Sequence, residues 1–242
     1  SKEKVDNLKD YLIKFIKKEI RRNKKMSDEK IVEYRGIRNL VVAPLKKDTK
    51  DELTYDTPFA LAGTSELSKE TESSSDTHYY DNEAAIVINT TGADTVNVNV
   101  SAVSLKNTSA ITGQKFDEKT GALIEGTATP PYMAMGYITE DTDGREYYVW
   151  RLKGRFGNPS DSHKSKDNGT DANGQELAYT GVNTQKKFVA NDNKSAKATV
   201  GPADSCGMSE EEFFSKVQTP DDIIKTTPSG EQTQNAEENP AG

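Results

Sequence analysis

Residues 131–156, PYMAMGYITEDTDGREYYVWRLKGRF, decide the fold of this chain. Two runs of apolar and aromatic residues flank the polar segment Asp141-Thr142-Asp143-Gly144, whose composition is typical of a turn. We therefore predict a β-hairpin, with one strand from Pro131 to Ile138 and the other from Arg145 to Phe156. A hairpin of this length predicts a protein built mainly from β-strands.

The second strand of this hairpin alternates between two kinds of side chain. Because successive residues of a strand point to opposite faces, each kind occupies one face. The apolar face is predicted to enter the core, and it comprises Tyr148, Trp150, Leu152 and Phe156. The other face is predicted to meet water, an acidic neighbour or a lumen, and it comprises Tyr147, Val149, Arg151, Lys153 and Arg155.

Short apolar runs separated by turn residues recur on both sides of this hairpin. Residues 95–102 alternate with period two, which places Val96, Val98, Val100 and Ala102 on one face. Residues 37–44 and 53–62 predict a second hairpin, and residues 104–112 predict a short helix. Further strands are predicted at 84–89, which should be buried, and at 122–126, 176–183 and 186–190. Only 33% of the chain is hydrophobic, so the core is modest for 242 residues.

The two ends of the chain differ from this pattern. Residues 3–22 carry apolar side chains at helical spacing among lysines, which predicts a basic amphipathic helix: Val5, Leu8, Tyr11, Leu12, Phe15, Ile16 and Ile20. The apolar stripe is expected to pack on protein; anchoring to a membrane surface or nucleic acid is the alternative. Because Met26-Ser27-Asp28-Glu29 looks like an ordinary protein start, residues 1–25 are interpreted as an extension.

The remaining boundaries follow from the C-terminal sequence. Ser209 followed by Glu212 is a capping box and predicts a short helix within residues 209–226. Residues 227–242 lack apolar residues other than alanine and are predicted to be disordered. Residues 26–208 then form the β domain. Its polar stretch from Gly157 to Gly174 is expected to be a long loop that is mobile or used in contacts.

The net charge of −7 conceals an asymmetry. Residues 1–25 carry ten Lys and Arg against four Asp and Glu, whereas residues 26–242 carry 22 basic against 35 acidic side chains. The larger part has a net charge of −13, which disfavours a stable grip on nucleic acid. No apolar run is long enough to cross a membrane and no secretory signal is evident, so we expect a soluble protein made in the cytoplasm.

The sequence carries no recognisable catalytic or metal-binding signature, so we predict no enzyme, no cofactor and no metal. His78, His163 and Cys206 are too few and too scattered for a catalytic triad or a zinc site. Asp141 to Gly144 could hold calcium in principle, but a hairpin turn explains it more simply. Gly169 to Thr180 fails as a calcium loop because its first and last positions lack carboxylates. Asp221 and Asp222 lie in a solvent-like segment.

Several short motifs, in one order, resemble the major tail proteins of long-tailed phages of Gram-positive bacteria. The resemblance covers about residues 33–200. Its motifs are YRGIRNL at 34–40, APL at 43–45, LAG at 61–63, YYDN at 79–82, FDEKTG at 116–121, PYMAMGY at 131–137 and YVWRLKGRF at 148–156. Residues 1–25, the polar 157–174 segment and the chain after 209 depart from the family and inherit nothing from it.

The resemblance implies a β-sandwich or partly closed barrel that assembles with copies of itself. In this family the sheets of neighbouring subunits join into rings, usually six-membered, which stack into the tail tube of the virion. The implied partners are the tape-measure protein, the tail terminator and distal tail proteins, and phage DNA passing through the lumen. A net charge of −13 would suit a conduit to which DNA does not stick. The alternative is another β-sandwich module of a phage or cell surface, used for binding or decoration.

Overall fold

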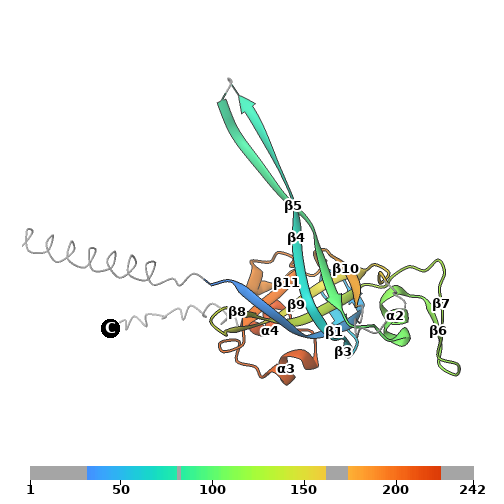
Figure 1. The fold of residues 1–242 in the computed structure, drawn as a ribbon. Coiled ribbons are helices and arrows are strands. Elements are labelled where there is room, and N and C mark those ends of the chain that lie inside the picture. Colours follow the sequence, from blue (N-terminus) through green and yellow to red (C-terminus); the bar gives the residue numbers. More distant parts are fainter. Residues whose placement is uncertain (1–31, 81–82, 162–173, 225–242) are drawn as a thin grey trace, which may run out of the picture. The chain divides into compact units, whose positions relative to one another are not determined.

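The computed structural model describes residues 32–80, 83–161 and 174–224, with the backbone alone over 74–80 and 83–90. The chain is mainly β, as predicted, with a large antiparallel sheet (Figure 1). The strands are β1 (Tyr34–Asp48), β2 (Leu53–Tyr55), β3 (Phe59–Ala62), β4 (Thr64–Tyr80), β5 (Glu83–Val100), β6 (Lys115–Asp117), β7 (Ala122–Ile124), β8 (Met133–Asp141), β9 (Glu146–Phe156), β10 (Gln175–Gly181) and β11 (Ala198–Pro202).

The strands of the large sheet follow the order β2-β1-β8-β9-β10-β5-β4. Strand β3 also pairs with β1, over Leu40 to Val42, and β11 also pairs with β9. Strands β10 and β11 therefore pair with different segments of the same strand, β9. Strand β10 pairs with Gly154 to Phe156, and β11 pairs with Tyr147 to Arg151. The sheet forks at β9.

The hairpin predicted over residues 131–156 is formed by β8 and β9. Its turn is closed by Asp141, whose carboxylate accepts hydrogen bonds from the backbone of Asp143 (2.9 Å) and Arg145 (3.0 Å). Gly144 has a φ of 83°, a conformation that glycine adopts without strain. The turn interpretation of Asp141 to Gly144 is thus confirmed, and the Asp141 carboxylate serves the turn.

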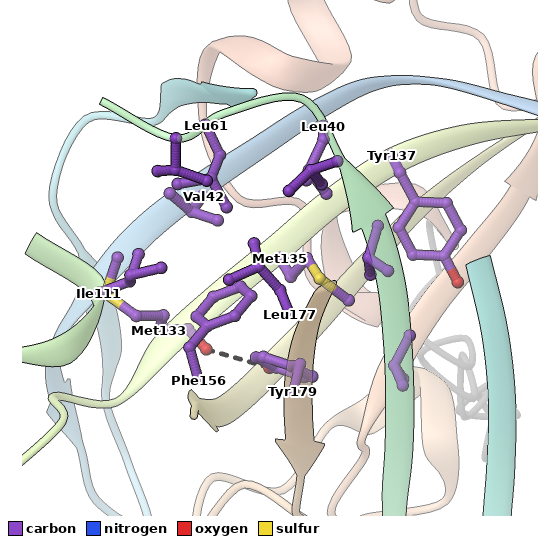
Figure 2. Packing of buried hydrophobic residues seen from close by; sticks show 14 of the residues in the cluster. Leu40, Val42, Leu61, Ile111, Met133, Met135, Tyr137, Phe156, Leu177 and Tyr179 are labelled. Carbon is purple, nitrogen blue, oxygen red and sulfur yellow. Dashed lines mark hydrogen bonds between the residues drawn. The ribbon is translucent and has the colours of Figure 1, made fainter. Parts of the chain in front are cut away.

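One hydrophobic cluster, the first cluster, gathers side chains from β1, β5, β8, β9 and β10 (Figure 2). Val96, Val98 and Val100 belong to it, as the alternation predicted, but β5 ends at Val100 and Ala102 is exposed. The cluster is closed by Ile111 of helix α2 (Leu105–Thr112), which confirms the helix predicted there. The Tyr179 hydroxyl donates to the Met133 carbonyl oxygen at 3.0 Å, so its polar end is satisfied inside the core.

The second cluster contains Val41 and Ala43 of β1 and Tyr148, Trp150 and Leu152 of β9, together with aromatic residues from the C-terminal part of the chain. Those aromatic residues lie in and before helix α3 (Glu210–Ser215), which is capped by Ser209 as predicted. A Cβ atom at Gly136 would lie 3.0 Å from the Trp150 ring, which explains the glycine within the 131–137 motif. The cluster comprises Val41, Ala43, Ala134, Ile138, Tyr148, Trp150, Leu152, Phe188, Phe213, Phe214 and Val217.

The alternation of β9 is interrupted by a β-bulge. Met133 pairs with Gly154 and Met135 with Arg151, so β9 has one residue more than β8 in this interval. The extra residue reverses the alternation, and Phe156 lies in the first cluster although Trp150 and Leu152 lie in the second. The prediction that Phe156 shares a face with them is therefore wrong, although all three are buried as predicted.

Other predicted elements differ from the structure in detail. Residues 53–62 form two short strands, and both pair with β1. Residues 186–190 are not a strand: Phe188 forms a single bridge with Lys194, and a 3-10 helix, η1 (Val189–Asn191), follows. Strands β4 and β11 and helix α4 (Pro220–Ile223) were not predicted. The predicted helix at 3–22, the disordered tail at 227–242 and most of the 157–174 loop lie outside the described residues.

Candidate assembly surface

Strands β4 and β5 form the longest hairpin in the described part of the chain. They pair from Thr64 with Val100 to Tyr80 with Glu83. Strand β10 pairs with β5 only from Asp94 to Val100. Beyond that point, Ser73–Tyr80 and Glu83–Thr91 have only each other as backbone partners among the described strands; we call these two segments the arm (Figure 1).

Strand β4 is also an edge strand. Within the described sheet it pairs with β5 alone, so one side of its backbone is not engaged in a β-ladder. Such an edge is a template on which a strand of another chain can pair. The described side chains near the start of the strand are polar and exposed, among them Ser65, Glu66 and Ser68. The edge is therefore open at the level of the backbone and carries no apolar patch there.

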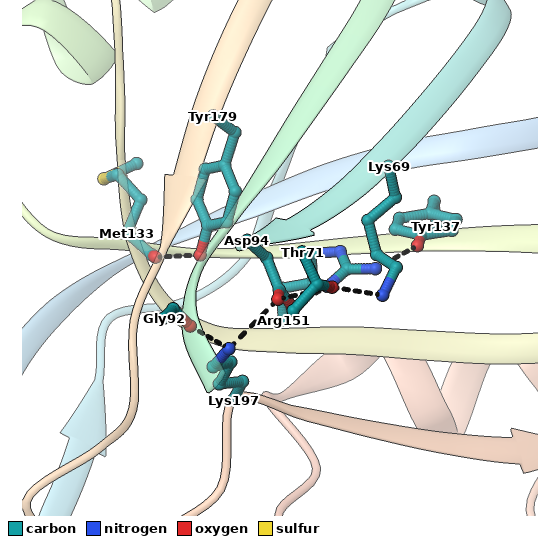
Figure 3. A network of polar contacts seen from close by, with 9 residues as sticks. All are labelled: Lys69, Thr71, Gly92, Asp94, Met133, Tyr137, Arg151, Tyr179 and Lys197. Atoms are coloured by element: carbon teal, nitrogen blue, oxygen red, sulfur yellow. Dashed lines mark hydrogen bonds and ion pairs between the residues drawn. The ribbon is translucent and has the colours of Figure 1, made fainter. Parts of the chain in front are cut away.

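A buried polar cluster lies where the arm joins the sheet (Figure 3). The Asp94 carboxylate accepts hydrogen bonds from Thr71 Oγ1 at 2.9 Å, Lys197 Nζ at 3.1 Å and Arg151 Nη1 at 3.1 Å. Only 5% of Asp94 and 7% of Arg151 is exposed. We call Asp94 and its three donors, Thr71, Arg151 and Lys197, the clasp.

The clasp stabilises the ionised form of its carboxylate. Burial alone would raise the pKa of Asp94, but the hydrogen bonds and charge of Lys197, together with the hydrogen bond from Thr71, lower it below its ordinary value. Arg151 also donates to the Tyr137 hydroxyl at 3.2 Å, whereas its Nε atom is buried and has no hydrogen-bond partner. Asp94 is therefore an anion that two cations from different parts of the fold share.

Of the cationic residues predicted to share one face of β9, two are buried in the structure and one is exposed. Arg151 and Lys153 do not face water, because only 7% and 9% of them is exposed. Each meets a buried carboxylate of the same chain, and Lys153 Nζ lies 2.7 Å from the Asp48 carboxylate. The acidic-neighbour prediction thus holds for both, and sequence reasoning missed Asp94 and Asp48. Arg155 is exposed, and its guanidinium lies 4.1 Å from the centre of the Tyr132 ring.

The residues considered for chemistry are only partly described by the structure. His163 lies outside the described residues, as do 169–173, and the side chain of His78 is not described. Asp222 caps α4 by accepting from Thr219, and Asp221 accepts from the backbone of Ala190. Among the residues that the structure describes, Cys206 is a free thiol and no three acidic, histidine or cysteine side chains gather as metal ligands would.

A shallow polar hollow lies between β4, β5 and β10, lined by Ser65, Asn99, Ser160, Asp161 and Gln175 among others. Among its described lining residues, the Ser65 hydroxyl donates to the Asn99 carbonyl oxygen and the Ser160 hydroxyl to that of Glu176. None of the helices within the described ranges is long and apolar enough to span a bilayer. The chain matches no model of a known protein family, and no curated protein matches it significantly.

Proposed function

We propose that this chain is a tail tube subunit of a long-tailed phage: a structural virion protein that assembles with copies of itself into stacked, hexameric rings and has no catalytic activity. The observation that carries the proposal is the arm, Ser73–Tyr80 and Glu83–Thr91. The order of motifs from residue 34 to residue 156, which resembles that of phage major tail proteins, supports the same conclusion.

The arm needs a partner for a physical reason. An isolated two-stranded ribbon is marginally stable in water, because it buries little surface and leaves two edges open. Strand β10 supports the hairpin only up to Asp94, and the described chain offers no further strand beside the arm. A second copy of the chain would supply buried area and backbone partners to the arm, and the open edge of β4 would continue the sheet from one copy to the next.

The pairing scheme also supports the partly closed barrel implied by the resemblance. Pairing runs from β1 through β8, β9, β10 and β5 to β4. Only Gly63 separates β4 from β3, and β3 pairs with β1 again. Ser101 N donates to the Gly63 carbonyl oxygen at 2.8 Å across this junction. In the proposed barrel the first cluster lies inside this circuit and the arm lies outside it.

In the assembled tail the proposed partners are other copies of this chain, the tape-measure protein, the tail terminator and the distal tail proteins. Phage DNA would pass through the lumen during ejection. The net charge of −13 on residues 26–242 supports a conduit that repels the DNA backbone, because like charges keep the two apart. Assembly would take place in the cytoplasm of the host, and the finished protein would reside in the virion tail.

The first test removes the arm and keeps the sheet. Replacing residues 73–92 by Asn-Gly joins Glu72 to Ala93 through a two-residue hairpin turn and retains Thr71 opposite Asp94. We expect the full chain to form rings or tubes in negative-stain electron microscopy, alone or with a tape-measure fragment. The armless variant should stay monomeric by light scattering while it keeps the β-sheet circular dichroism spectrum.

A matched control alters a different hairpin, that of β6 and β7. Replacing the turn residues 118–120 of β6–β7 by Gly-Asn-Gly changes an exposed turn without shortening the large sheet. We expect this variant to assemble like the unmodified chain. Strictly monomeric particles of the full chain under all conditions would contradict the proposal and favour a binding or decoration module. If the armless variant still forms tubes, the arm is not required for assembly and does not support the proposal.

A further inference from the structure

The clasp lies at the point where the sheet narrows from three strands to two. Among the residues of β5 that pair with β10, Asp94 is the one nearest the arm, and it lies opposite Gly181. Between the pairs Thr71 with Asp94 and Ser73 with Thr91 the register shifts, because β5 has one residue more than β4 there, directly beside the clasp. A β-bulge bends and twists a strand locally, so a two-stranded ribbon that leaves a sheet at a bulge can pivot there.

The donors of the clasp come from both sides of this pivot. Thr71 belongs to β4, at the root of the arm, whereas Arg151 lies in β9 and Lys197 directly precedes β11. Neither β9 nor β11 pairs with β5 through its backbone. The carboxylate of Asp94 therefore links the root of the arm directly to β9 and to the start of β11 through side chains. This link adds to the backbone ladder, which connects β5 with β9 only through β10. Lys197 adds a second tie, because its ammonium group also donates to the Gly92 carbonyl oxygen.

The charges of the clasp make it a fixed link. Two cations share one buried carboxylate, so each cation depends on Asp94 and has no second carboxylate within salt-bridge distance in the described structure. A buried charge that loses its partner is strongly unfavourable. This cost opposes any rotation of the arm that would move Asp94 away from Arg151 and Lys197. An exposed pair at the same place would break and reform at little cost.

From this geometry we propose that the clasp is a brace that sets the direction in which the arm leaves the sheet. The brace acts within one copy of the chain, so it goes beyond the proposed assembly and does not depend on it. Backbone pairing holds β4 to β5 along the arm, and the clasp holds that ribbon to β9 and the start of β11. Without the clasp the ribbon persists and pivots at the bulge.

The test measures the direction of the arm in the monomeric fraction of the full chain. In a Cys206→Ser background, spin labels at Thr77 in β4 and at Thr180 in β10 report one intramolecular distance by double electron–electron resonance. The unmodified clasp should give a single narrow distribution. We expect Asp94→Asn to broaden it about twofold, because the ribbon then pivots at the bulge.

The chain offers a matched control at a buried aspartate of another strand, β1. Asp48→Asn breaks the other buried ion pair, Lys153 with Asp48, whose residues belong to β9 and β1 and not to the strands of the arm. It should leave the distance distribution narrow. If Asp48→Asn broadens the distribution as much as Asp94→Asn does, the effect is a general loosening and the brace is refuted.

A second variant keeps the proposal testable if Asp94→Asn does not fold. Arg151→Met removes the link to β9 and leaves Lys197 and Asp94 as a neutral pair, so the sheet should still form. It should broaden the distribution as well, and amide hydrogen exchange in Ser73–Tyr80 should accelerate. A folded Arg151→Met protein with a distribution as narrow as that of the parent would overturn the proposal.

Discussion

The indole of Trp150 connects strand β9 with the C-terminal helices. It is fully buried, its ring centre lies 5.7 Å from that of Phe214, and its Nε1 donates to the Phe213 carbonyl oxygen at 3.1 Å. The side chain therefore combines a large buried surface with a satisfied polar group, the arrangement that buried tryptophan requires. The sequence predicted its burial from the alternation of β9 and predicted a short helix within residues 209–226, but not that this helix covers the indole.

Truncating this side chain should be costly. Trp150→Ala removes the indole from the second cluster and leaves a cavity, so we expect it to reduce the free energy of unfolding by about 3–5 kcal/mol. Urea denaturation followed by circular dichroism measures the change. Ile124→Ala is the control: Ile124 is 57% exposed, and its loss should change stability by less than about 0.5 kcal/mol. Equal effects of the two substitutions would contradict the assigned packing.

At the scale of elements, the hairpin of residues 131–156 could be predicted because its information is local: two apolar runs and a turn sequence. Strand β4 could not, because TSELSKETESSSDTHYY is largely polar and is ordered by backbone pairing with β5. The ion-pair partners of Arg151 and Lys153 could not be predicted from the sequence either, because they are distant in the chain. Asp94 and Asp48 lie 57 and 105 residues away in the chain, and nothing in the period of β9 points to them.

The C-terminal helices should behave as part of the core. Phe213 and Phe214 of α3 are buried against Tyr148 and Trp150. A chain that ends at Met208 loses them and uncovers the second cluster, so we expect it to bind the dye ANS and to lose cooperative thermal unfolding. A chain that ends at Thr226 retains both helices and should unfold like the full chain. Full stability of the shorter truncation would contradict this packing.

At the scale of the whole molecule, the stability of the fold depends on ionised aspartates. Hydrogen bonds from the backbone of Lys119 and of Arg145 lower the pKa of Asp117 and Asp141, respectively. The Arg145 side chain lowers that of Asp204. Burial opposes the same shift at Asp94 and Asp222, where hydrogen bonds prevail over it. These groups bind protons more weakly in the folded chain than in the unfolded one.

The chain should therefore be acid-labile. A carboxyl group whose folded pKa is lowered stabilises the fold above its unfolded pKa, about 3.9 for aspartate, and this stabilisation is lost as pH falls through the folded pKa. We expect the free energy of unfolding to decline below about pH 4 in urea titrations made at successive pH values. Asp141→Asn should lower stability at pH 7 and give a shallower decline, so the two curves converge in acid. Parallel curves would exclude this role for Asp141.

The bulge of β9 also bears on how this sequence can change over time. The bulge brings Phe156 into the first cluster, which also holds Val149, whereas Trp150 and Leu152 lie in the second. Both faces of β9 therefore meet packed side chains, and β9 lacks the freely variable alternate positions of an ordinary surface strand. Substitutions there must be matched by changes in two separate neighbourhoods, one around Tyr179 and one around Phe213. The strand with the strongest pattern in the sequence is thus the one with the least freedom to lose it.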